Sequence, residues 1–151
     1  VPALATDDGR VITESPVVLQ YLADLHPEAG LAPARGTPAR TALEQWLNLL
    51  CSEVHSAVFV PMFHPASPPE AKAFAKVRLQ SKFDLLEKHL AGRDWLLDQF
   101  SIGDIYLATM LGWCEPAGVD LGGWPGLAAF RDRVRARPAV ARALGDELAL
   151  R

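Results

Sequence analysis

The chain has 151 residues, of which half are hydrophobic and 22% are charged, with a formal net charge of -3. This length suffices for one compact domain, or for one domain and part of a second. No apolar run reaches the roughly 18 residues of a membrane-spanning helix, and the weakly acidic balance gives no reason to expect a nucleic-acid partner. Because the chain begins with Val1 instead of Met, we expect that a segment precedes it.

The two cysteines, Cys51 and Cys114, lie far apart and outside any CxxC or metal-ligand spacing. We therefore expect no metal site and a reduced, cytoplasmic setting. Each cysteine is expected to be a small buried hydrophobic side chain.

The first 27 residues predict a β-hairpin followed by a helix. Apolar runs at 1–4 and 10–12 flank Asp7-Asp8-Gly9, and Asp-Gly is typical of a tight hairpin turn. An isolated hairpin is marginal in water, so we expect these strands to belong to a larger sheet. Ser15-Pro16 then predicts a helix with Ser15 as its N-cap, which His26-Pro27 closes.

A segment rich in Pro, Gly and Ala, residues 28–37, predicts a linker, and two long helices are expected after it. The first helix has Thr37 as its cap and ends near Pro61. Ser67 and Glu70 stand at capping-box spacing before the second helix, which Gly92 terminates. The first helix carries one continuous apolar stripe: Leu43, Leu47, Leu50, Val54 and Val58.

Ser101 and Asp104 form a further capping box, in which each side chain can bond the backbone amide of the other residue. Residues 105–113 are apolar on nearly every face, as in a helix surrounded by other helices. We expect this central helix to pack on the helical pair, and loss of its cap to cost about 1 kcal/mol. Two shorter helices follow near 127–134 and after Pro138. The late arginines predict a solvated face: Arg131, Arg133, Arg135, Arg137 and Arg142.

The order and spacing of these elements resemble the glutathione transferase family, and in particular its bacterial beta class. The most specific pieces are Trp46-Leu47-Asn48, Ser52-Glu53-Val54-His55, Pro61-Met62-Phe63-His64-Pro65, Asp104-Ile105-Tyr106-Leu107 and Leu111-Gly112-Trp113. The resemblance implies a mostly α fold. Residues 1–27 would be the last β-β-α unit of a thioredoxin-like, glutathione-binding domain, 28–37 the linker, and 38–151 the all-helical C-terminal domain.

Glutathione carries a γ-glutamyl carboxylate and ammonium, so its site needs an anion cradle beside a carboxylate. Glu14-Ser15 fits, because a helix start favours negative charge: Ser15 would hold the carboxylate and Glu14 the ammonium. Without the resemblance, Ser15 reads as a simple cap and Glu14 as a surface acid. By resemblance, Pro2 is a cis-proline and Val1 a backbone ligand of the cysteinyl part of glutathione.

The resemblance also places His55 opposite the glutathione thiol, although Ser56 stands where the beta class typically carries a lysine. A pocket for the second substrate would be lined by Phe59, Met62, Phe63 and Trp113. The implied protein is a homodimer that joins glutathione to hydrophobic electrophiles, or that reduces small disulfides and peroxides.

The family activates the thiol with a Cys, Ser or Tyr near the start of the thioredoxin-like domain. We assign no residue of this chain to that role, because Cys51 and Cys114 fall within predicted helices. Two alternatives therefore stay open: a non-catalytic interaction domain of glutathione-transferase type, and an inactive truncated fragment.

Overall fold

The computed structural model describes residues 2–150. Strands β1 (Ala3–Ala5) and β2 (Val11–Thr13) form the predicted antiparallel hairpin, with Leu4 opposite Ile12. Gly9 has a φ of 82°, a left-handed conformation that a residue with a side chain rarely adopts, which explains why the Asp-Gly turn forms here.

Helix α1 (Ser15–Leu25) begins one residue earlier than expected. The carbonyl of Glu14 accepts hydrogen bonds from the amides of Val17 and Val18, each at 2.9 Å, and so closes the first turn. Glu14 is therefore the N-cap, its side chain makes no capping bond, and the prediction that Ser15 caps this helix is wrong. The short 3-10 turn η1 (Pro27–Ala29) follows.

The first long helix consists of three consecutive segments, α2 (Pro38–Leu49), η2 (Leu50–Phe59) and α3 (Val60–Phe63). The hydroxyl of Thr37 accepts from the amide of Arg40 at 3.2 Å, which confirms the predicted cap. All five residues of the predicted stripe are at most 1% exposed. Segment η2 has the wider π-type turn, so the amide of Val60 donates to the carbonyl of His55. Such turns are rare and often occur at functional sites.

Helix α4 (Pro69–Leu90) is the second member of the helical hairpin. Its N-cap is Pro68, which has no side-chain donor or acceptor, and Ser67 lies one residue before this N-cap. The predicted capping box of Ser67 and Glu70 is therefore wrong. Gly92, with a φ of 73°, follows the end of the helix as expected.

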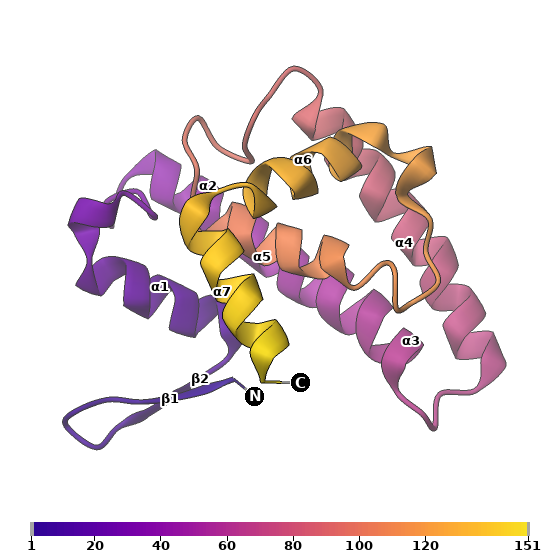
Figure 1. Ribbon diagram of the computed structural model, residues 1–151, viewed down its shortest axis with the longest axis horizontal. Coiled ribbons are helices and arrows are strands. Elements are labelled where there is room, and N and C mark those ends of the chain that lie inside the picture. The colour runs from indigo at the N-terminus through magenta and orange to yellow at the C-terminus, as the bar shows by residue number, and fades with distance from the viewer. Residues whose placement is uncertain (1, 151) are drawn as a thin grey trace.

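Helix α5 (Ile102–Gly112) lies in the middle of the helical assembly, between α6 and the long rod that runs from α2 to α3 (Figure 1). It also contacts α1. Most of its residues are buried, and both hydrogen bonds of the capping box of Ser101 and Asp104 are present. The remaining elements are η3 (Leu121–Gly123), α6 (Pro125–Arg135) and α7 (Pro138–Ala149). None of the helices described within residues 2–150 is long and apolar enough to cross a membrane.

Helix α6 receives its cap from α4. The carboxylate of Glu87 accepts from the amides of Gly126 and Leu127, both at 2.8 Å, and so binds amides that the start of a helix leaves unpaired. Trp124 donates its indole N–H to Asp84 at 2.7 Å. These contacts hold the start of α6 against α4, and α6 also packs against α5.

The late arginines are only partly a solvated face. The guanidinium of Arg137 lies 3.7 Å from the centre of the Phe100 ring, and Arg133 and Arg137 both lie within 6 Å of the Trp95 ring centre. Such cation–π contacts stabilise the connector against the end of α6. The expected solvated face holds for the exposed Arg135, Arg137 and Arg142, whereas Arg131 and Arg133 are half-buried.

Arg40 joins α2 to α1 and to the linker. Its guanidinium is 3% exposed and donates to both carboxylate oxygens of Asp24, at 2.7 and 3.0 Å. It also donates to the side chain of Gln20 and to the carbonyl of Pro33. The hydrogen bond from Arg40 holds the pKa of Asp24 below its usual value.

Candidate functional site

The start of α1 combines backbone strain with a free donor. Glu14 has a φ of 70° and is the one residue other than glycine with a positive φ among those described. Such a conformation costs on the order of 1–3 kcal/mol and is concentrated at functional sites. Within residues 2–150 the amide of Ser15 has no hydrogen-bond acceptor, and Pro16 has no N–H. The helix therefore begins with a donor available to an anion.

Pro2 lies next to this helix start. The register of the hairpin pairs Ala3 with Thr13, so its continuation by one residue places Pro2 opposite Glu14. The predicted backbone ligand, Val1, lies outside the described residues. The cis form of Pro2 stays a prediction.

Tyr106 on α5 connects α1 with η2. Its hydroxyl lies 3.0 Å from Nδ1 of His55, and the side chains of Ser15 and Cys51 lie near it. Burial, the main cause, and then Cys51 raise the pKa of Tyr106 far above its usual value, so the phenol keeps its proton. The structure thus brings together two predicted site residues, Ser15 and His55, through a tyrosine.

Sequence reasoning missed Tyr106 because the central helix reads as uniformly apolar. A signal was present, since a tyrosine on a buried helix needs a partner for its hydroxyl. Cys51 was expected to be a buried hydrophobic residue, but it is half-buried with its thiol beside that hydroxyl. That expectation is wrong for Cys51. It is confirmed for Cys114, whose thiol pKa burial raises to about 12.

His55 is neutral at physiological pH, because burial lowers its pKa below the ordinary 6.5. Its ring centre lies 5.0 Å from that of Trp113. The imidazole is therefore enclosed by Tyr106 on one side and by an aromatic surface on another.

An aromatic cavity of about 400 Å³ borders His55. The rings of Phe59 and Phe63 stack at 5.9 Å, and Trp113 meets both edge-on. Three of the four residues expected to form a pocket thus line it, while Met62 packs against the hydrophobic core. The lining side chains are His55, Phe59, Val60, Phe63, His64 and Trp113. This wall suits a flat apolar molecule.

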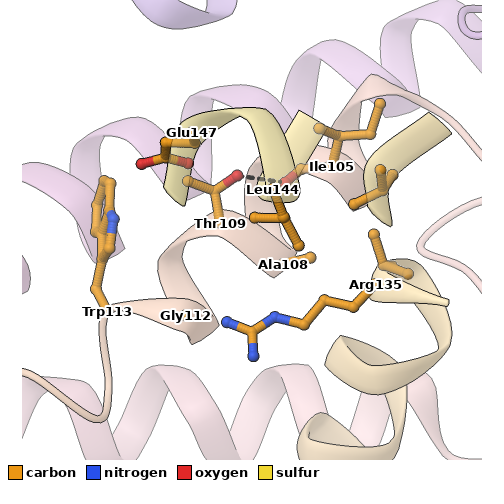
Figure 2. Close-up of a pocket in the computed structure, with 10 residues that line it drawn as sticks. Ile105, Ala108, Thr109, Gly112, Trp113, Arg135, Leu144 and Glu147 are labelled. Carbon is orange, nitrogen blue, oxygen red and sulfur yellow. Dashed lines mark hydrogen bonds between the residues drawn. The ribbon is translucent and has the colours of Figure 1, made fainter. Parts of the chain in front are cut away.

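A second cavity of about 200 Å³ lies between α5, α6 and α7, and Trp113 lines both cavities. Figure 2 shows the Arg135 side chain extending along α5 toward Gly112. A Cβ at position 112 would lie 2.9 Å from the guanidinium, so the glycine allows the arginine to lie against the helix. Arg135 and Trp113 both line this cavity.

Comparison with known proteins identifies the family. Residues 69–133 match the model of the glutathione S-transferase C-terminal domain. The chain is 36% identical over 148 residues to the glutathione S-transferase GstA of Escherichia coli O157:H7, covering 97% of this chain and 73% of that protein. The chain belongs to the glutathione S-transferase family.

Solved glutathione S-transferases agree with this assignment. A sphingomonad glutathione S-transferase complexed with glutathione is 46% identical to this chain, with a TM-score of 0.92. The match covers 97% of this chain and 73% of the sphingomonad protein. The bacterial beta class enzyme of Sphingomonas chungbukensis is 42% identical with a TM-score of 0.93, at the same coverage. The chain is therefore close to bacterial beta-class members, and it spans about three quarters of their length.

The fold expected from the resemblance is confirmed: a mostly helical chain with the C-terminal domain of a glutathione S-transferase and part of a thioredoxin-like unit. The boundaries at residues 27 and 37 stay a prediction, as do the roles of the individual site residues.

Proposed function

We propose that this protein is a glutathione transferase that binds glutathione between the start of α1 and His55. The observation that carries the proposal is the hydrogen bond of Tyr106 to His55, which lies near Ser15 where α1 packs on α5 and places the imidazole at the aromatic cavity. The helix start would take one end of the tripeptide, and the imidazole would face the thiol.

At the helix start, the γ-glutamyl carboxylate accepts from the free amide and from the hydroxyl of Ser15, and the carboxylate of Glu14 pairs with the ammonium group. A helix start attracts anions through its unpaired amides and its dipole. The strained backbone of Glu14 supports this role, because it turns the chain sharply between β2 and α1. Pro2, and Val1 as a backbone ligand, would bind the cysteinyl part from the hairpin.

At the other end, His55 assists the thiol. When the protonated Tyr106 donates to Nδ1, the neutral imidazole carries its proton on Nε2 and can donate to a thiolate. The thiol proton passes to solvent, the thiolate sulfur forms a bond to the electrophilic carbon, and the leaving group departs with its electron pair. The same thiolate would attack small disulfides or peroxides.

The second substrate would be a hydrophobic electrophile held by Phe59, Phe63 and Trp113, with Met62 supporting them from the core. Phe59 is fully buried and Phe63 is 45% exposed, so the cavity has a fixed floor and an open rim. A broad apolar wall with few polar groups favours ligands with a large apolar surface, and it discriminates little between their polar substituents.

The test uses the protein at the length at which its source produces it. Glutathione affinity is measured by calorimetry, and transfer to 1-chloro-2,4-dinitrobenzene by absorbance. Ser15→Ala and Glu14→Gln should each weaken glutathione binding about tenfold, the scale of one charge-assisted hydrogen bond. Ser52→Ala, which removes an exposed hydroxyl on η2, is the matched control and should change neither quantity. Unchanged affinity in both site variants would refute the site.

We also propose a homodimer in a cytoplasmic setting. Phe74 and Val77 on α4 are 62% and 67% exposed, and such apolar side chains support self-association. Phe74→Glu should lower the mass measured by sedimentation from dimer to monomer. If the wild-type protein neither binds glutathione nor self-associates but co-purifies with a larger partner, the interaction-domain alternative replaces the enzyme.

A further inference from the structure

A cavity of about 570 Å³ lies apart from the proposed glutathione site and shares no lining residue with the two cavities beside Trp113. The linker and the part of α2 from Ala39 to Trp46 form one wall. The end of α4 and the connector between α4 and α5 form the other. The hollow exists because the first wall carries very small residues: Gly30, Ala32, Ala39 and Ala42. Its volume suits a small organic molecule.

The aromatic surface of this cavity is held in place before any ligand arrives. The ring centres of Trp46 and His89 lie 4.4 Å apart. Nε2 of His89 lies 2.9 Å from the carbonyl oxygen of Leu96, and because a carbonyl only accepts, the ring donates there and is fixed in orientation. Phe100 adds a further ring to the lining. A flat aromatic ligand could therefore stack without reorganising the cavity.

Two opposite charges line the cavity without partners. Arg93 and Asp98 are exposed, and within residues 2–150 neither side chain makes a hydrogen bond or an ion pair. The neighbouring Arg133 and Asp94, by contrast, pair with each other. A guanidinium matches the geometry of a carboxylate, and a free carboxylate accepts from a hydroxyl or N–H group.

We propose that this cavity binds a planar aromatic carboxylate that also carries a hydroxyl or N–H donor. The ring lies against Trp46 and His89, Arg93 pairs with the carboxylate, and Asp98 accepts from the donor. This site does not depend on glutathione and makes no use of the proposed catalytic residues.

The test is calorimetric titration of the protein, at its natural length, with three matched probes. These are 6-hydroxy-2-naphthoate, 2-naphthoate, which lacks the donor, and 2-naphthol, which lacks the carboxylate. Arg93→Gln should weaken 6-hydroxy-2-naphthoate about tenfold and leave 2-naphthol nearly unchanged. Asp98→Asn should reduce the preference for the hydroxylated acid over 2-naphthoate. Arg142→Gln, on α7, is the control and should change none of the affinities.

The location is tested separately. Ala42→Phe fills the cavity and should abolish binding, and Ala39→Leu, at an exposed position, should weaken it if the larger substitution does not fold. The indole N–H resonance of Trp46 should shift on titration while that of Trp113 does not. No binding of any probe at millimolar concentration would overturn the proposal. So would binding that is unaffected by Ala39→Leu and Arg93→Gln but is lost in Phe63→Ala, because the probe would then occupy the aromatic cavity.

Discussion

The hydroxyl of Tyr106 lies 3.0 Å from Nδ1 of His55, although the two residues are 51 positions apart. The tyrosine comes from the buried central helix and the histidine from the π-type segment that packs on it. The side chain of Ser15, on α1, lies near the same hydroxyl. The phenol therefore lies where α1, α5 and η2 meet and orients His55, and we regard Tyr106 as a positioning residue for the proposed glutathione site.

Tyr106→Phe removes only the hydroxyl and should lower glutathione affinity about fivefold, since a hydrogen bond contributes about 1 kcal/mol. The His55 ring should become mobile, which would appear as changed chemical shifts in its imidazole resonances. Tyr21→Phe, on α1 and outside the network, is the control. Unchanged affinity together with unchanged His55 resonances would contradict a positioning role.

Asp104→Ala should destabilise the protein by about 3 kcal/mol or more, measured as the free energy of unfolding in urea. The fully buried carboxylate accepts from the amide of Leu96 at 2.8 Å, and from the amide and the hydroxyl of Ser101 at 2.7 and 3.0 Å. The sequence-based expectation of about 1 kcal/mol considered only the cap, and the additional bond to the amide of Leu96 is the reason for the larger loss expected here. The exposed cap Asp120, replaced by Ala, should cost about 1 kcal/mol. Equal losses in the two variants would contradict this reasoning.

Stability should fall as the pH is lowered from about 6.5, and part of that fall should come from His55. Burial lowers its folded pKa, so between that pKa and the ordinary 6.5 the unfolded chain binds more protons than the folded chain. The contribution of neutral His55 to the free energy of unfolding is therefore fully present above pH 6.5, and it is lost as the pH falls toward the folded pKa. His55→Gln should flatten the pH dependence of the urea midpoint in this window. A slope identical to that of the wild-type protein would show that His55 does not contribute.

Glu87→Ala should cost about 1–2 kcal/mol of stability and expose the start of α6, because both capping bonds to Gly126 and Leu127 are lost. Amide hydrogen exchange should accelerate at these two residues first. Glu115→Ala, at an exposed position, should leave exchange and stability unchanged. Slow exchange at the start of α6 in the Glu87 variant would mean that other contacts hold the helix.

The sequence predicted the order of the helices and the buried stripe, because the spacing of apolar residues and the glycine that ends a helix depend only on nearby positions in the chain. It did not predict the π-type turn, since Leu50, Val54 and Val58 recur every four residues, a spacing compatible with either helix. The cap at Ser67 was misplaced for another reason. Pro68 already has the extended conformation of a cap, so the helix starts one residue later.

For the site, Glu14, Ser15 and His55 were proposed from motifs and resemblance, whereas Tyr106 and Cys51 were not. Spacing along one helix cannot show which side chains from other helices meet it. A tyrosine and a cysteine count as apolar in a hydrophobicity pattern, so their polar atoms are identified only when the tertiary contacts are known.

The ion pair of Arg40 and Asp24 links the folding of the two parts of the chain. Arg40 is almost inaccessible, and three of its four partners, Asp24, Gln20 and Pro33, precede residue 38, while Glu44 lies on α2 itself. Detaching α1 would remove the bidentate carboxylate of Asp24 and the Gln20 side chain and leave Arg40 with Glu44 and the carbonyl of Pro33, so the separation of α1 from the helical part is costly. The helix that presents Ser15 and the bundle that presents His55 should therefore unfold in a single cooperative transition, and partial melting would not leave half a binding site behind.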